Sequence, residues 1–78
     1  MRSHIFYEVR DGSGAIWGGE SANECIEFYR RNDSINATIW ASEWEGGEGV
    51  ELYQTSKAID VTTIVLATML ASLQRETV

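Results

Sequence analysis

The chain has 78 residues, a formal net charge of −6 and a single cysteine, Cys25. This length fits one domain, and a lone cysteine excludes the intramolecular disulfide framework of small secreted proteins. The acidic balance argues against nucleic acid or an anionic membrane as a direct partner. The sequence therefore predicts a soluble cytoplasmic protein, with residues 1–78 forming one domain.

The N-terminal part predicts a β-hairpin. Residues 4–10 read HIFYEVR, and alternate Ile, Tyr and Val on one face with more polar residues on the other. Asp11 and Gly12 then supply the backbone angles of a tight turn, and residues 15–18 form a short returning strand. Trp17 on this strand is expected to belong to the core.

A helix is predicted over residues 22–31. Ser21 and Glu24 have the spacing of a capping box, in which the side chain of each bonds the backbone N–H of the other. Apolar residues then recur at helical spacing: Ala22, Cys25, Ile26 and Tyr29. Cys25 on this stripe is expected to be a small buried hydrophobic residue.

A second strand pair follows, over residues 35–45 and 50–55, joined by an acidic loop rich in glycine. Its first strand reads INATIWASEWE, so that isoleucine and alanine alternate with Asn, Thr, Trp and Ser. Trp40 and Trp44 share the face opposite the Ile and Ala stripe. Both core packing and partner binding remain open for these two indoles.

The last helix is predicted over residues 58–74, with Ser56 or Asp60 as its N-cap. No charged residue stands between Asp60 and Arg75, so this helix is either a central core element or a subunit contact. The apolar run is too short for a membrane-spanning helix, which needs about 20 residues. The residues expected to mediate self-association are Leu66, Met69, Leu70 and Leu73.

Together these elements predict an α+β fold with the order ββαββα. Consecutive hairpins favour a four-stranded antiparallel sheet with both helices on one face, which makes a two-layer domain. The other face of the sheet stays open, and Trp40, Trp44 and Tyr53 are expected to line it.

This aromatic set is the candidate site for a protein partner, because Trp and Tyr are enriched in interfaces. The acidic loop and its flanks are expected to form a rim around it that steers a basic partner. The predicted partner-binding residues are Trp40, Trp44, Tyr53, Glu43, Glu45 and Glu48. The loop lacks the ligand spacing of an EF-hand, so a solvated hairpin tip is favoured over a cation site.

No catalytic, metal-binding or cofactor-binding constellation stands out in the sequence. His4 is the only histidine, and no Cys/His cluster or nucleophile and base pair assembles around it. The glycines match neither the dinucleotide fingerprint nor the phosphate loop. The sequence therefore predicts a protein that is not an enzyme and has no cofactor.

The chain is acidic and contains no proline. It includes the segments VRDGSGAIWGGESANECIEFYRR and AIDVTTIVLATMLASL. In this respect the chain resembles small uncharacterised proteins of tailed phages that infect actinobacteria. The resemblance covers the whole chain without a diagnostic motif. It implies a non-enzymatic protein that acts in the host cytoplasm and binds a host protein.

Two functional hypotheses follow. The first is a homodimeric protein-interaction module, whose dimer contact is the last helix, the tryptophan face, or both. The alternative is an acidic inhibitor that mimics nucleic acid and occupies a DNA- or RNA-binding enzyme. The carboxylates that would imitate phosphates are Glu43, Glu45, Glu48 and Glu51, with Glu20, Glu24 and Glu27.

Overall fold

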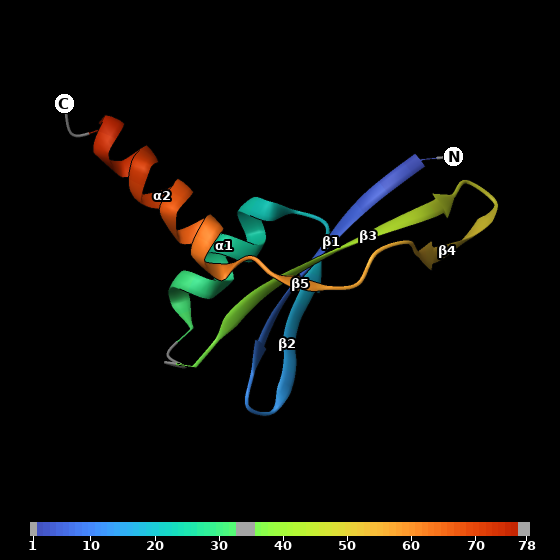
Figure 1. Ribbon diagram of the computed structural model, residues 1–78, viewed down its shortest axis with the longest axis horizontal. Helices are drawn as coiled ribbons and strands as arrows, with labels where there is room; N and C mark the ends of the chain where they lie inside the picture. Colours follow the sequence, from blue (N-terminus) through green and yellow to red (C-terminus); the bar gives the residue numbers. More distant parts are fainter. Residues whose placement is uncertain (1, 33–35, 77–78) are drawn as a thin grey trace.

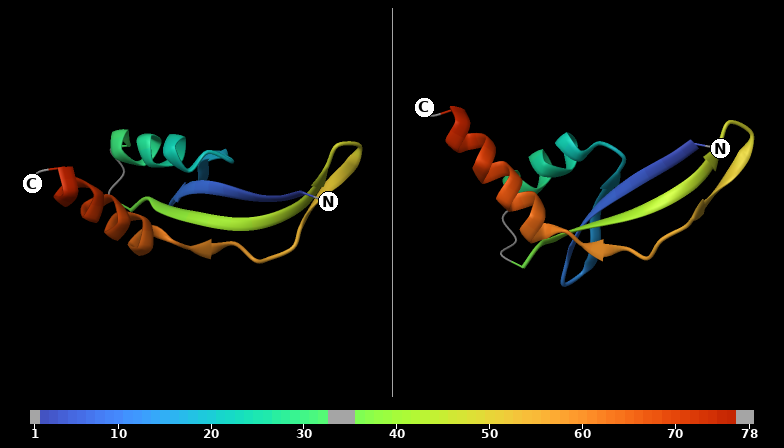
Figure 2. Two further views of the ribbon diagram at one scale, coloured as in Figure 1. Left: turned by 90° about the horizontal axis from the view of Figure 1, so that it is seen from above. Right: turned by 45° about the horizontal axis from the view of Figure 1, so that its top comes forward.

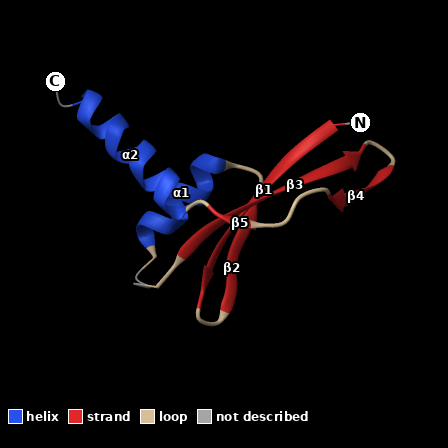
Figure 3. Ribbon diagram, in the orientation of Figure 1, coloured by secondary structure: helices blue, strands red, loops and turns tan. Residues whose placement is uncertain are grey.

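The computed structural model describes residues 2–32 and 36–76, and the side chains of residues 3–32 and 36–71. The fold is α+β, and its described elements are drawn in Figures 1 and 3. In chain order they are β1 (Arg2–Asp11), β2 (Gly14–Gly19), α1 (Ala22–Arg31), β3 (Thr38–Gly47), β4 (Val50–Gln54), β5 (Ile59–Asp60) and α2 (Thr62–Glu76). The predicted first residue of the third strand, Ile35, lies outside the described residues.

The strands form one antiparallel sheet in the order β2-β1-β3-β4, and β5 also pairs with β3. The long strands β1 and β3 form its spine, and Figure 2 shows how strongly they curve. Val9 pairs with Ile39, so the alternating apolar residues of both strands lie on the same face. The predicted α+β class with an antiparallel sheet is confirmed.

The segment before α2 differs from the prediction. Residues 59 and 60 are a short strand, β5, rather than the first turn of a helix. The Thr62 hydroxyl oxygen accepts a hydrogen bond from the Ile39 backbone N–H at 2.7 Å, which extends this pairing by one residue. Asp60 accepts from the Thr62 backbone N–H at 2.9 Å and from its hydroxyl at 2.7 Å. The helix therefore begins at Thr62, four residues later than expected.

Ser56, the other candidate cap, has a different role. Its hydroxyl oxygen accepts a hydrogen bond from the Glu43 backbone N–H at 2.9 Å. The Thr55 backbone N–H donates to the Glu43 carbonyl at 2.9 Å. Side chain and backbone thus keep the edge of β3 bonded where the chain passes from β4 to β5.

The core lies between α1 and the sheet. Among the described residues its buried hydrophobic members are Val9, Cys25, Ala37 and Ile39. Trp17 packs against them and stacks on Phe28 of α1 with ring centroids 6.3 Å apart, as the sequence predicts. At the start of α1 the Ser21 hydroxyl accepts from the Glu24 backbone N–H at 3.2 Å, which is one of the two hydrogen bonds of the predicted capping box.

Both helices lie at one end of the molecule. In Figures 1 and 2, α1 packs on the sheet, whereas α2 leaves from β5 and extends away from the strands. Only the start of α2 reaches the core, through Val61 and Val65. The radius of gyration is 14.1 Å, whereas a compact chain of this length has about 11.5 Å. A single copy is therefore extended, because α2 projects at one end and the β3–β4 hairpin at the other (Figure 1).

Candidate functional site

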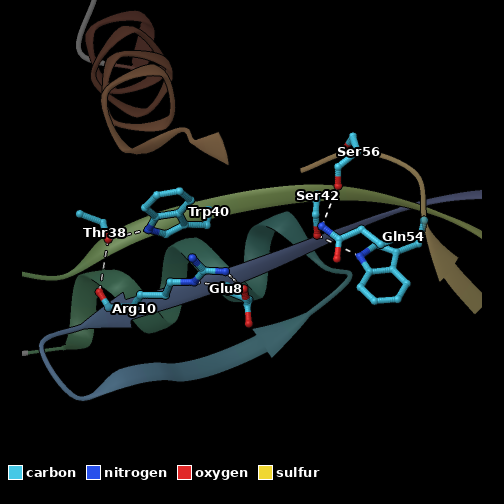
Figure 4. Close-up of polar contacts among 8 residues, drawn as sticks. Glu8, Arg10, Thr38, Trp40, Ser42, Gln54 and Ser56 are labelled. Atoms are coloured by element: carbon cyan, nitrogen blue, oxygen red, sulfur yellow. Dashed lines mark hydrogen bonds and ion pairs between the residues drawn. The ribbon is translucent and has the colours of Figure 1, made fainter. Parts of the chain in front are cut away.

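The two faces of the sheet are named after the element that covers them or its absence. The helix face carries Val9 and Ile39 and packs against α1. The open face is the opposite side and carries the alternating residues, among them Arg10 and Trp40. Figure 4 looks onto the open face, with α1 behind the sheet.

The structure separates the predicted partner-binding residues between these faces. Trp40 and Trp44 lie on the open face, whereas Glu43 and Glu45 alternate with Trp44 and point to the other side. Tyr53 pairs directly with Glu45, and its hydroxyl donates to the Glu45 carboxylate at 2.9 Å. Tyr53 and the two glutamates therefore lie on the helix face, beyond α1, which corrects the predicted acidic rim around the tryptophans.

Glu48, the third predicted glutamate, lies in the turn between β3 and β4. Its φ of 53° is the only positive value for a residue other than glycine among the described residues. The hairpin tip thus places Glu48 at the end of the sheet, away from Trp40 in the middle of β3.

Both indoles of the open face are held by the same local motif. The Trp40 Nε1–H donates to the Thr38 hydroxyl at 2.8 Å, and the Trp44 Nε1–H donates to the Ser42 hydroxyl at 2.9 Å. Each acceptor stands two residues earlier on the same face of β3, and Figure 4 shows Thr38 beside Trp40. The only polar atom of each indole is thereby bonded within the chain, and each ring gives a fixed, apolar surface.

A charged pair lies beside these rings. The Arg10 guanidinium stands 4.6 Å from the Trp40 ring centroid and bonds the Glu8 carboxylate at 2.6 Å. The side chains of Arg10 and Glu8 are each 36% exposed, so water screens this pair and its contribution to stability is small. At the other end Phe6 meets Trp44 edge to face, with centroids 5.4 Å apart.

The open face is hollowed beside its aromatic side chains. A shallow hollow of about 500 Å³ lies over it, lined by Phe6, Glu8, Ser42, Trp44 and Gln54 among others. Apolar rings and a few polar groups in one hollow suit the centre of a protein interface. The surroundings offer recognition groups but no activated nucleophile.

His4 joins distant segments rather than forming part of a catalytic set. Its Nδ1 lies 2.7 Å from the Glu20 carboxylate, and its Nε2 lies 3.2 Å from the Gly46 carbonyl oxygen. Both partners are acceptors, so both hydrogen bonds form together only when each ring nitrogen carries a proton. The histidine thereby ties the segment before α1 to the end of β3.

The described residues show few features of a catalytic or metal-binding site. They contain no group of three or more His, Cys, Asp or Glu side chains arranged to hold a metal ion. Burial raises the pKa of the Cys25 thiol, which keeps it protonated and weakly nucleophilic. In the part of the chain that the structure describes, neither helix is long and apolar enough to span a membrane.

The predicted self-association residues lie on α2. Leu66 is 39% exposed and Leu70 58% exposed, and Met69 is half-buried. The Leu73 side chain lies outside the described residues. Ile64, on another side of the helix, is 66% exposed. The helix therefore presents large apolar side chains to water on more than one side in a single copy.

Sequence reasoning missed a second apolar surface, on the helix face beyond α1. This surface, the bare patch, consists of Ile5, Ala41 and Ile59. The lengths of the helix and the strands contain the information that would have revealed the bare patch. Ten residues of helix span about 15 Å, whereas ten residues of strand span about 33 Å, so α1 cannot cover the full length of β1.

No protein-family model, no curated protein and no solved structure matches the chain. Its function is therefore inferred from the surfaces described above.

Proposed function

We propose that the protein is a non-enzymatic protein-interaction module that works as a homodimer through α2. The observation that carries this proposal is the exposure of Leu66 and Leu70, 39% and 58% exposed, on a helix whose sequence has no charge from Val61 to Gln74. A helix that faces water on this scale normally keeps a charged side. A second chain removes these side chains from water.

The total surface supports the same proposal. One copy exposes 5816 Å², whereas a compact monomer of this mass exposes about 4,700 Å². The excess of about 1,100 Å² is comparable to the roughly 800 Å² that each partner contributes to a standard stable interface.

Light scattering over a dilution series tests the dimer. The wild type is expected to keep a two-chain mass down to about 1 μM, the affinity range of a standard interface. Leu70→Glu is expected to give a single-chain mass with unchanged far-UV circular dichroism, because it places a charge in the apolar contact. Ala71→Glu adds the same charge at the next, also exposed, position and is expected to remain dimeric. A single-chain mass for the wild type at all concentrations refutes the proposal.

The open face then serves a foreign protein partner. Trp40 and Trp44 are fixed rings of the kind that dominate interface energetics, and the hollow beside them contains the Glu8 carboxylate. The net charge of −6 favours a partner with a basic surface, whose association slows as salt increases.

A pull-down with the double variant Trp40→Ala and Trp44→Ala tests this surface. The matched control is Tyr53→Ala, an aromatic truncation on the helix face. We expect the double variant to lose a partner that the wild type and the control both retain. Equal recovery of every partner by a folded double variant would exclude the open face as the binding site.

The alternative of a nucleic-acid mimic gains no support from a specific observation. Two of the carboxylates assigned to the mimic pair with side chains of the same chain: Glu20 with His4, and Glu27 with Arg31. A mimic instead requires many carboxylates available to basic residues of its target.

A further inference from the structure

The helix face is only half covered in a single copy. Ile5 is 45% exposed and Ile59 is 59% exposed, and Ala41 stands between them. Together with Glu43 and Lys57 they line a shallow groove of about 360 Å³. In Figure 2 this end of β1 and β3 has no described helix packed on it. The bare patch is therefore an apolar surface that continues the core of the same sheet.

The same chain also contains an apolar helix without a surface to pack on. After Val65 the described part of α2 runs away from the sheet, toward the end of the molecule opposite the bare patch (Figure 1). Leu66 and Leu70 are one helical turn apart on one side of it. The direction in which α2 leaves β5 prevents this side from reaching the bare patch of its own chain.

We propose that α2 of a second copy packs on the bare patch, and that the two copies exchange this contact reciprocally. The proposal rests on the homodimer proposed above and specifies its geometry. Residues on α2 of one chain contact the sheet of the other and the reverse, which is the form of a two-fold symmetric interface. Each sheet then carries its own α1 and the partner's α2 on the helix face.

The dimensions and shapes of the two surfaces agree. Residues 66–76 of α2, which follow its contact with the core, span about 16 Å, and α1 leaves about 18 Å of β1 uncovered. The small side chain of Ala41 between Ile5 and Ile59 makes a depression that a leucine side chain fills. One interface of this kind covers both apolar surfaces, whereas pairing of two α2 helices would leave Ile5 and Ile59 in water.

The charges around the patch fit this occupant. Glu43 pairs directly with Ile5 across β1 and β3, and Lys57, of opposite sign, lines the same groove; both side chains are exposed and can keep contact with water. The apolar side of α2 brings no charge to oppose them.

Site-specific disulfide formation between two copies tests the geometry. One Cys25→Ala chain carries Ile5→Cys, and a second, with a mass tag, carries Leu70→Cys. A disulfide requires Cα atoms within about 7 Å, so linkage reports direct apposition. We expect the mixed Ile5–Leu70 product to exceed either homodimeric product by about tenfold, the ratio a tenfold difference in effective concentration gives. The control is Ile64→Cys, which is more exposed than Leu70 but lies on another side of α2, and should not link to Ile5→Cys.

The outcomes separate the two proposals. Predominant Leu70–Leu70 linkage, or linkage from Ile64 equal to that from Leu70, overturns the reciprocal arrangement and leaves the homodimer intact. A single-chain mass for the wild type overturns both. The variant Ile5→Glu, which keeps Cys25, provides a second test. We expect its dimer to dissociate at a concentration about a hundredfold higher, since a charge is buried without a partner. An unchanged dimer in Ile5→Glu refutes the bare patch as the contact.

Discussion

The two ends of the β1 and β3 pair differ in what covers them. At one end α1 and the first turn of α2 enclose Val9, Cys25 and Ile39, which are almost completely buried. At the other end the same strands on the same face present Ile5 to water. The residue types are alike, so the difference comes from the short length of α1 and the direction of α2. One end therefore stabilises the single chain, and the other is available for association.

Similar truncations at the two ends should differ strongly in their effect on the free energy of unfolding. In a Leu70→Glu background, expected to be monomeric, Ile39→Ala should lower the free energy of unfolding by about 3 kcal/mol, through lost burial and a cavity. Ile5→Ala should lower it by less than about 0.5 kcal/mol, because the side chain is already partly in water. Urea denaturation followed by tryptophan fluorescence measures both values. Equal losses would show that the bare end also belongs to the core of one chain.

Much of the covered end is predictable from local patterns. The capping pair Ser21 and Glu24, the helical stripe with Cys25, and the strand alternation that contains Ile39 each specify a face without knowledge of the fold. Trp17 follows because its strand pairs with β1 opposite Val9. These features depend on neighbours close in the sequence, so the sequence describes them well.

The predicted sheet face of Tyr53 was wrong, and the alternation of residue types along the strand cannot reveal the reason. In the β3–β4 pair, Gly47 pairs with Val50, but Glu45 pairs with Tyr53. Two residues of β4 thus lie opposite Gly46 alone, which is a β-bulge. Without it, Tyr53 would pair with Trp44 and lie on the open face, since a shift of one residue exchanges the faces.

Gly46 makes this bulge sterically feasible. Its φ is +121°, and a Cβ at this position would lie 2.5 Å from the Glu51 carbonyl oxygen. The sequence contains several glycines in this hairpin, so the position of the bulge, and with it the face of Tyr53, depends on tertiary geometry. The exposed direction of α2 was unpredictable for the same reason, because it follows from the two-residue pairing of β5.

The junction between β5 and α2 offers a way to detach α2 from the covered end. Thr62→Val keeps the shape of the side chain but removes the acceptor of the Ile39 backbone N–H, a bond of 2.7 Å. We expect a loss of about 1–3 kcal/mol in the free energy of unfolding, the penalty of an unsatisfied, partly buried donor. Hydrogen exchange of the Ile39 amide should become faster. Thr62→Ser retains the hydroxyl and should keep the slow exchange, and similar rates in both variants would contradict this role.

A smaller effect is expected from the pH dependence of the same junction. Hydrogen bonds from the Thr62 hydroxyl and backbone N–H lower the pKa of the exposed Asp60 carboxyl below its usual range. A pKa lowered by folding means that the stabilisation is complete above the unfolded value of about 3.9 and is lost as pH falls through the folded pKa. Helicity at residues 62–66 should therefore decrease in acid before the core unfolds.

Nuclear magnetic resonance shifts of the Thr62 amide measured from pH 6 down to pH 2 report this step. Asp11 provides the internal comparison, because hydrogen bonds from Ser13 also lower its pKa, but in the β1–β2 turn far from α2. Asp60→Asn keeps an oxygen acceptor and removes the titrating group, so its α2 amides should no longer respond while Ser13 still does. If α2 in Asp60→Asn retained the acid transition of the wild type, another carboxyl would control the start of the helix. The proposed dimer contact, which requires α2 to leave β5 in a fixed direction, would then depend on that group instead.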